Sequence, residues 1–168
     1  TATGQSVTME TADQLHSSLA SYKDSKVSAP ETFVITVSGT GGESNEYIQF
    51  RADATTDFDH AIDAYKLFGF STAPQIYTSD GKNLYSINCL PLDISNYNLP
   101  VSVKFSAAGK YKLTFSGMNK VKNYGIQLED LQTHEIIPVN AGTSYSFSFN
   151  KGDDPNRFVL HINGVTAV

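Results

Sequence analysis

Cysteine is almost absent from this sequence. Cys89 is the only one among the 168 residues, so no disulfide can form within the chain. It lies in the apolar run 87–90, where a small buried hydrophobic side chain fits better than a reactive thiol. The lack of disulfides does not decide the compartment, because cytosolic proteins lack them and so do surface proteins that are stabilised by a core or by ions.

Tryptophan, long apolar runs and clustered positive charge are missing as well. No stretch approaches the roughly 18 apolar residues of a membrane helix, and no signal peptide is visible, so we expect no transmembrane segment. The net charge is −5, and the twelve Lys and Arg residues are scattered along the chain. A nucleic-acid partner is therefore not expected. Because the chain begins at Thr1, we expect it to be one domain of a longer, multidomain parent protein.

The familiar catalytic motifs are also absent from the sequence. The sequence has no nucleophile elbow, no zinc-protease motif and no phosphate-binding loop, and the glycine-rich run 39–42 falls in an expected hairpin loop. The four histidines are far apart in the sequence, which favours separate histidines over a zinc cluster. We expect no enzyme activity, since a hydrolase would need acids brought together from distant strands.

What the sequence does contain is alternation of apolar and polar residues along most of its length, the pattern of half-buried strands. Turn residues at 107–109, 140–142 and 151–155 separate these segments. The pattern predicts an all-β fold, an antiparallel β-sandwich of the jelly-roll type. Residues 1–30 are expected to form an N-terminal arm or first strand region, and residues 31–168 the sandwich. The expected strands lie at 33–37, 47–51, 74–78, 84–88, 101–105, 111–115, 126–128, 145–149 and 158–162.

The alternation is interrupted at residues 57–66. Phe58, Ile62 and Tyr65 have the spacing of one face of a helix, and this predicts a short helical insertion that ends near Gly69. An acidic residue at the start of this segment would serve as the N-cap and another would lie in the first turn, where the helix dipole favours negative charge.

Three carboxylates in this segment are candidate metal ligands. Asp57, Asp59 and Asp63 could share a Ca²⁺ ion with backbone carbonyls, because calcium prefers oxygen ligands. The alternative needs no ion. Asp57 would cap the helix, Asp59 would interact with its dipole, and Asp63 would pair with Lys66.

Aromatic residues in loops are the candidate ligand-binding residues, because exposed rings stack on sugars while polar neighbours bind the hydroxyl groups. Tyr97 lies between Asn96 and Asn98, and Tyr124 is a second such ring. The alternative for each ring is packing over the edge of the sandwich, since most tyrosines here follow the alternation of core positions.

The residues from Phe33 to Ile162 contain an ordered set of short elements. They resemble a β-sandwich domain of large secreted proteins of Bacteroidetes-type bacteria, which commonly stands just before the C-terminal sorting signal of the type IX secretion system. The elements are Ile48-Gln49-Phe50, Asp57-Phe58-Asp59, Asp63-Ala64-Tyr65-Lys66, Pro74-Gln75-Ile76-Tyr77, the stretch from Leu84 to Pro91, Gly109-Lys110-Tyr111-Lys112-Leu113, Leu128-Glu129-Asp130, Tyr145-Ser146-Phe147 and Arg157-Phe158.

The resemblance implies a non-catalytic domain of a secreted or cell-surface protein. The function we expect first is binding or adhesion, with a polysaccharide or a surface protein as partner. The second is a structural spacer that supports secretion and surface display. The third is a glycoside hydrolase.

Overall fold

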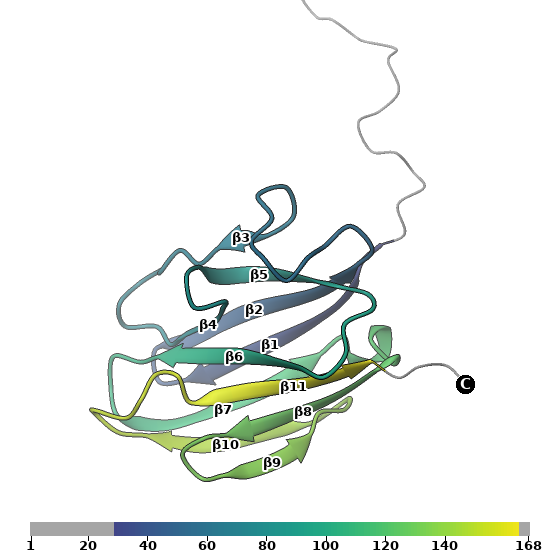
Figure 1. Ribbon diagram of the computed structural model, residues 1–168. Coiled ribbons are helices and arrows are strands. Elements are labelled where there is room, and N and C mark those ends of the chain that lie inside the picture. The colour runs from purple at the N-terminus through teal and green to yellow at the C-terminus, as the bar shows by residue number, and fades with distance from the viewer. Residues whose placement is uncertain (1–28, 165–168) are drawn as a thin grey trace, which may run out of the picture.

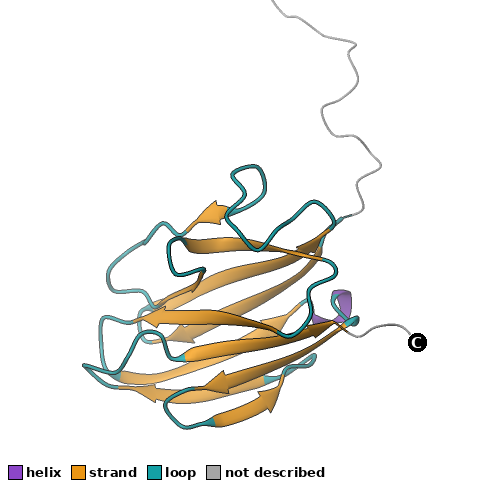
Figure 2. Ribbon diagram, viewed as in Figure 1, coloured by secondary structure: helices purple, strands orange, loops and turns teal. Residues whose placement is uncertain are grey.

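The computed structural model describes residues 29–164. Strands form nearly all of the regular structure in this part of the chain (Figure 2), which confirms the predicted all-β fold. One short 3-10 helix, η2 (Met118–Lys120), lies between two strands. The strands are β1 (Glu31–Gly39), β2 (Gly42–Arg51), β3 (Ala64–Tyr65), β4 (Gln75–Ser79), β5 (Leu84–Pro91), β6 (Tyr97–Lys104), β7 (Gly109–Ser116), β8 (Tyr124–Asp130), β9 (Glu135–Pro138), β10 (Ser144–Phe149) and β11 (Phe158–Gly164).

All these strands belong to one continuous sheet. Their order is β10-β7-β1-β2-β5-β4-β6-β11-β8-β9, with β3 paired to β5 beside this path. The sheet curls, so that β1, β2, β7 and β10 lie behind β6, β11 and β8 (Figure 1). The sequence predicted a purely antiparallel sandwich, but the sheet is mixed, because β2 and β5 pair in parallel. A parallel pair needs a long crossover connection, which residues 52–83 supply.

The core lies inside this curl. Along β1, Phe33, Ile35 and Val37 are fully buried, as their alternation predicts. Rings from strands at different positions in the sheet meet across the interior: the ring centroids of Phe147 and Phe158 are 5.0 Å apart. The curl therefore brings apolar faces of one sheet together, as two sheets do in a sandwich.

The predicted helix at 57–69 is wrong. The backbone closes a single helical turn, in which the Asp63 N–H donates to the Asp59 carbonyl at 2.8 Å. After that turn, Ala64 and Tyr65 pair with β5. The Asp63 carboxylate also accepts a hydrogen bond from the Cys89 N–H at 2.7 Å. Pairing with a neighbouring strand thus overrides the local helical spacing.

The domain boundary between residues 30 and 31 stays a prediction; the first strand that the structure describes, β1, begins at Glu31. The predicted N-terminal arm lies almost entirely outside the described residues. Within residues 29–164, no helix has the length and apolar character needed to cross a bilayer.

Candidate functional site

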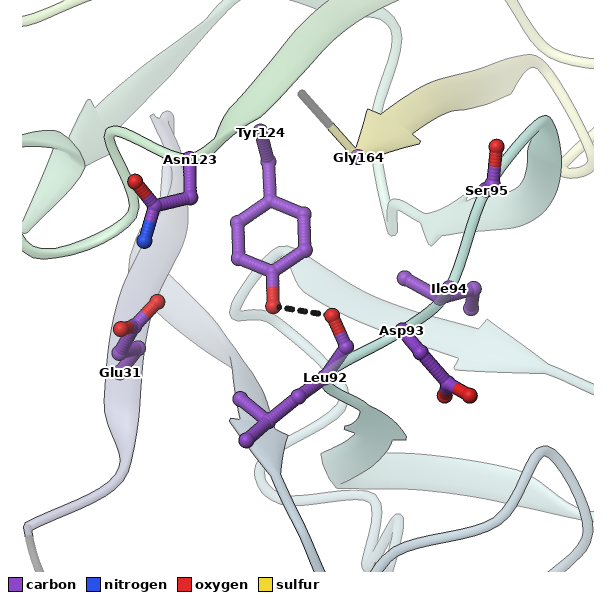
Figure 3. Close-up of a pocket in the computed structure, with 8 residues that line it drawn as sticks. All are labelled: Glu31, Leu92, Asp93, Ile94, Ser95, Asn123, Tyr124 and Gly164. Carbon is purple, nitrogen blue, oxygen red and sulfur yellow. Dashed lines mark hydrogen bonds between the residues drawn. The ribbon is translucent and has the colours of Figure 1, made fainter. Parts of the chain in front are cut away.

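A hollow of about 380 Å³ lies at one end of the curled sheet (Figure 3). One wall is the β5–β6 loop, residues 92–95. The other consists of Glu31 at the start of β1, Asn123 and Tyr124 at the start of β8, and Gly164 at the end of β11. Its volume falls within the range of about 300–1,000 Å³ that is usual for small-molecule sites. Segments from four distant parts of the sequence therefore meet at one surface.

Contacts among these segments hold the β5–β6 loop in place. The Tyr124 hydroxyl donates to the Leu92 carbonyl at 2.9 Å, and Figure 3 shows this bond across the hollow. Gly164 passes so close to the loop that a Cβ atom there would lie 2.7 Å from the Ile94 carbonyl oxygen. A side chain at this position would push the loop away, so the glycine is needed for this wall to form.

Tyr124, one of the predicted ligand-binding residues, lines the hollow, but it does not present its ring for stacking. The side chain is buried, and its ring stacks on Phe50 with centroids 3.7 Å apart. Burial raises the pKa of the Tyr124 hydroxyl, and the nearby charges of Glu31 and Asp93 raise it further. The part of Tyr124 that bears on the hollow is therefore its protonated hydroxyl, which positions Leu92.

Polar groups of the hollow are acidic or neutral. Glu31 and Asp93 supply carboxylates, Ser95 a hydroxyl and Asn123 an amide, and no Lys or Arg is among the lining residues that the structure describes. The Oε2 atom of Glu31 is buried and accepts no hydrogen bond from the described residues. In Figure 3 the Asn123 amide points toward the Glu31 carboxylate, whereas the Asp93 carboxylate turns away from both. This end of the molecule therefore favours neutral or cationic ligands over anions.

The other predicted ligand-binding residues do not line this hollow. Tyr97 is the first residue of β6 and is half-buried against the core, and burial raises the pKa of its hydroxyl. Asn96 lies in the preceding turn at φ 51°, a left-handed conformation that asparagine tolerates. Asn98 points outward from β6, where its Oδ1 lies 2.7 Å from Nδ1 of His161. The predicted loop site is thus divided between a turn, the core edge and the outer face of the sheet.

The three candidate calcium ligands serve the local backbone. Oδ2 of Asp63 accepts from the Asp59 N–H and Oδ1 from the Cys89 N–H, both at 2.7 Å. Oδ1 of Asp59 accepts from the Ala61 N–H at 2.9 Å. Asp57 is exposed, and Thr55 is bound to its backbone and not to its carboxylate. Among the described residues, no three His, Cys, Asp or Glu side chains are grouped to hold a metal ion.

The details predicted for a helix in this segment change accordingly. The residue that caps the turn is Asp59 and not Asp57. Lys66 does not pair with Asp63 but donates from Nζ to the Ser44 hydroxyl at 3.1 Å. Cys89 is buried, and burial with the nearby Asp63 carboxylate raises the pKa of its thiol to about 12, which supports a structural role.

Sequence reasoning missed Glu31 and Asp93. Neither lies in a motif, they are far apart in the sequence, and only the curl of the sheet brings their segments together. Asn123 stands out in the sequence only as a neighbour of Tyr124. Comparison with known proteins finds nothing further, since no protein-family model, no curated protein and no solved structure matches the chain.

Proposed function

We propose that this chain is a non-catalytic binding module that holds one or two sugar units of a polysaccharide in the hollow at the β5–β6 loop. The parent protein is then secreted or displayed at the cell surface, as expected from the resemblance to type IX secretion cargo. The support is the hollow itself, which combines a usual ligand volume with polar groups of several kinds.

The observation that carries the proposal is the buried Oε2 atom of Glu31, which accepts no hydrogen bond from residues 29–164. Leaving a buried acceptor without a donor costs about 1–3 kcal/mol, and such atoms are rare in folded proteins. A sugar hydroxyl is a donor of the right kind, and a bond to an ionised carboxylate is stronger than one between neutral groups. Ligand binding would therefore recover a cost that the free protein bears.

The rest of the lining suits the same ligand. Asn123 offers both donors and an acceptor, and Ser95 a hydroxyl, which together match the mixed donor and acceptor character of sugar hydroxyls. Leu92 and Ile94 offer apolar surface for the C–H groups of a sugar ring. Because both charged groups are carboxylates, the fitting ligands are neutral sugars or amino sugars, and uronic acids are disfavoured.

The test is binding of the full chain to a panel of neutral, amino-substituted and acidic polysaccharides, with calcium and with a chelator. Glu31→Gln should weaken binding of a neutral polysaccharide at least about tenfold, since a charge-assisted hydrogen bond is worth about 1.5–3 kcal/mol. The matched control is Glu43→Gln, which removes the same charge from an exposed position of β2. Equal binding by both variants contradicts this site, and no binding by the native chain favours the spacer.

A glycoside hydrolase is the second candidate, because Glu31 and Asp93 bring two carboxylates from distant segments to one hollow. Binding is preferred, since the Asp93 carboxylate turns away from Glu31 (Figure 3). Release of reducing sugar from a bound polysaccharide, abolished in both Glu31→Gln and Asp93→Asn, would establish the hydrolase instead.

A further inference from the structure

A second concave surface lies at the opposite end of the sheet. Three connections meet there: the β3–β4 loop (66–74), the β6–β7 turn (105–108) and the β10–β11 loop (150–157). In Figure 1 they lie on the left, where β6 ends, away from the end where β11 leaves the sheet. Two hollows of about 580 and 190 Å³ share Lys104, Phe105 and Ser106 in their linings. They are therefore neighbouring hollows, and together they are called the loop groove below.

The loop groove is held in shape by contacts between its connections. The Ser106 hydroxyl donates to the Thr72 carbonyl at 3.2 Å, which ties the β6–β7 turn to the β3–β4 loop. The β1–β2 turn packs against the same point, since a Cβ atom at Gly41 would lie 2.1 Å from the Thr72 carbonyl oxygen. The Val103 N–H donates to the Pro155 carbonyl at 2.8 Å, which fixes the third connection. A groove that is already formed binds without the cost of ordering its loops.

Aromatic surface is exposed along this groove to an unusual degree. Phe70 lines it with 86% of its surface exposed, and Phe68 with 46%. Phe70 stacks on no other ring in the described part of the chain, whereas Phe68 packs edge-on against Tyr77. Large apolar side chains left in water at one place mark binding surfaces more often than chance. Phe70 is thus a free ring face beside a groove.

The charge of the loop groove is opposite to that of the hollow at the β5–β6 loop. Lys104 and Lys151 line it, and within the described part of the chain no Asp or Glu is among its lining residues. The Lys104 ammonium lies 4.9 Å from the centroid of the Phe68 ring, a cation–π contact that holds it at the groove. Two acids follow Lys151 in the sequence, but their carboxylates accept backbone N–H groups, Asp153 from Asn150 and Asp154 from Asn156.

We propose that the loop groove binds an anionic polysaccharide, one that carries carboxylate or sulfate groups. The ring of Phe70 would cover the C–H face of a sugar, while Lys104 and Lys151 would pair with its acidic groups. Gln75 and Ser71, also in the lining, offer partners for hydroxyl groups. Nucleic acid fits less well, because two lysines on a chain of net charge −5 neutralise few phosphates. An anionic membrane fits less well too, because docking on anionic lipids draws on clusters of several basic residues and the groove offers two.

The experiment compares each anionic polymer with its uncharged counterpart. The full chain is titrated with polygalacturonate and its methyl ester, and with dextran sulfate and dextran. Binding of at least one anionic polymer is expected, at least about tenfold tighter than its neutral counterpart, and weakening as salt is raised. Phe70→Ala should lower this affinity about tenfold with the same salt dependence. Lys104→Gln with Lys151→Gln should lower the affinity and also flatten the salt dependence.

The matched control is the pair Lys110→Gln and Lys112→Gln, which removes two exposed charges from the outer face of β7. It should leave binding unchanged if the groove is the site. Equal loss in the control overturns the proposal, because binding would then follow net charge alone. So does equal affinity for charged and neutral polymers, or no binding of either anionic polymer.

Two further measurements distinguish a polysaccharide groove from a membrane or nucleic-acid surface, and from the neutral-sugar hollow. The chain is also tested for sedimentation with phosphatidylglycerol vesicles and for retention by single-stranded DNA. If either is seen and is lost in Phe70→Ala, while neither anionic polysaccharide binds, the groove belongs to a membrane or to nucleic acid. Glu31→Gln should not weaken binding of the anionic polymer, so failure of the loop groove and failure of the neutral-sugar hollow can be told apart. A variant is compared only if its melting temperature equals that of the native chain. We expect this to hold, because the side chains of Phe70 and of the lysines are exposed.

Discussion

Two regions of the sheet each bury a carboxyl group, and they treat it in opposite ways. Where β8 and β11 lie against β10, the Asp130 carboxylate accepts hydrogen bonds from Nε and Nη2 of Arg157, at 2.9 and 2.7 Å. It accepts a third from the Tyr145 hydroxyl at 2.8 Å. In the region of β2, β4 and β5, Glu46 has one oxygen bonded to the Thr78 hydroxyl at 2.7 Å and the other without a partner among the described residues. Both side chains are almost fully buried.

The difference appears in their pKa values. Burial works to raise the pKa of Asp130, but the bonds from Arg157, Tyr145 and the Gln132 N–H outweigh it and hold that pKa below its usual value. Burial raises the pKa of Glu46 to about 8, against the smaller effects of Thr78 and Lys66. A buried carboxyl group therefore stays charged only where a cation and several donors face it. One group closes the curled sheet as an ion pair, and the raised pKa of the other favours its protonated form at neutral pH.

The largest expected effect comes from breaking the ion pair. Arg157→Met should lower the free energy of unfolding by about 3–5 kcal/mol, because Asp130 would remain as a buried, unpaired charge. The guanidinium also donates to the Ser148 carbonyl at 2.6 Å and lies over the Phe147 ring. Its loss should therefore loosen the packing of β10 against β8 and β11 across the interior. Urea denaturation measures the change. Arg51→Met, which breaks the solvent-exposed pair with Asp53, is the control and should have little effect.

The second prediction concerns the pH dependence that Glu46 creates. Its pKa is higher in the folded chain than the ordinary value of 4.5, so its contribution to stability is complete below about pH 4.5 and is lost as the pH rises through about 8. Between pH 6 and 7 the loss should be at most about 1.4 kcal/mol, the limit for one proton. Glu46→Gln should remove this slope, as denaturation curves at several pH values would show. An unchanged slope in the variant would mean that Glu46 is ionised when folded.

A smaller effect sharpens the contrast by removing one donor from Asp130. Tyr145→Phe should cost about 1 kcal/mol, because the carboxylate loses a hydrogen bond while the arginine remains. It should also raise the pKa of Asp130 and so move acid unfolding to higher pH. Tyr47→Phe is the matched control, since that ring is partly exposed and its hydroxyl makes no hydrogen bond among the described residues. Equal losses in the two variants would assign the effect to the tyrosine ring and not to the bond.

The smallest effect is expected at a third group of carboxylates, near β3. Asp63→Asn should lower the melting temperature slightly, because one oxygen that accepts a backbone N–H is replaced by an amide NH₂. The loss should be the same in calcium and in chelator if Asp63 serves only the backbone. A loss seen only when calcium is present would instead support the calcium site predicted from Asp57, Asp59 and Asp63.

Strand positions were readable from the sequence because alternation is a local property. Phe33, Ile35 and Val37 had to share one face of any strand that contained them, whatever lay beside it. The serines and aromatic residues of β10 follow the same rule, with Tyr145, Phe147 and Phe149 buried and the serines exposed. The all-β class followed from such segments. The short strands β3 and β9 have too few residues to show a period, and they were missed.

What the tertiary structure alone decided is which segments meet. Nothing local in β2 specifies a parallel partner. The spacing of Phe58, Ile62 and Tyr65 favours a helix, but the hydrogen bond from the Cys89 N–H to Asp63 ties this segment to β5 instead. Glu31 and Asp93 gained a shared hollow, and Phe70 and Lys104 a shared groove, only because the sheet curls and its loops converge. The alternation of a strand shows which of its faces is buried. It does not show which strands lie beside it, because strand pairing depends on contacts between residues far apart in the chain. The same alternation fits every order of strands in the sheet.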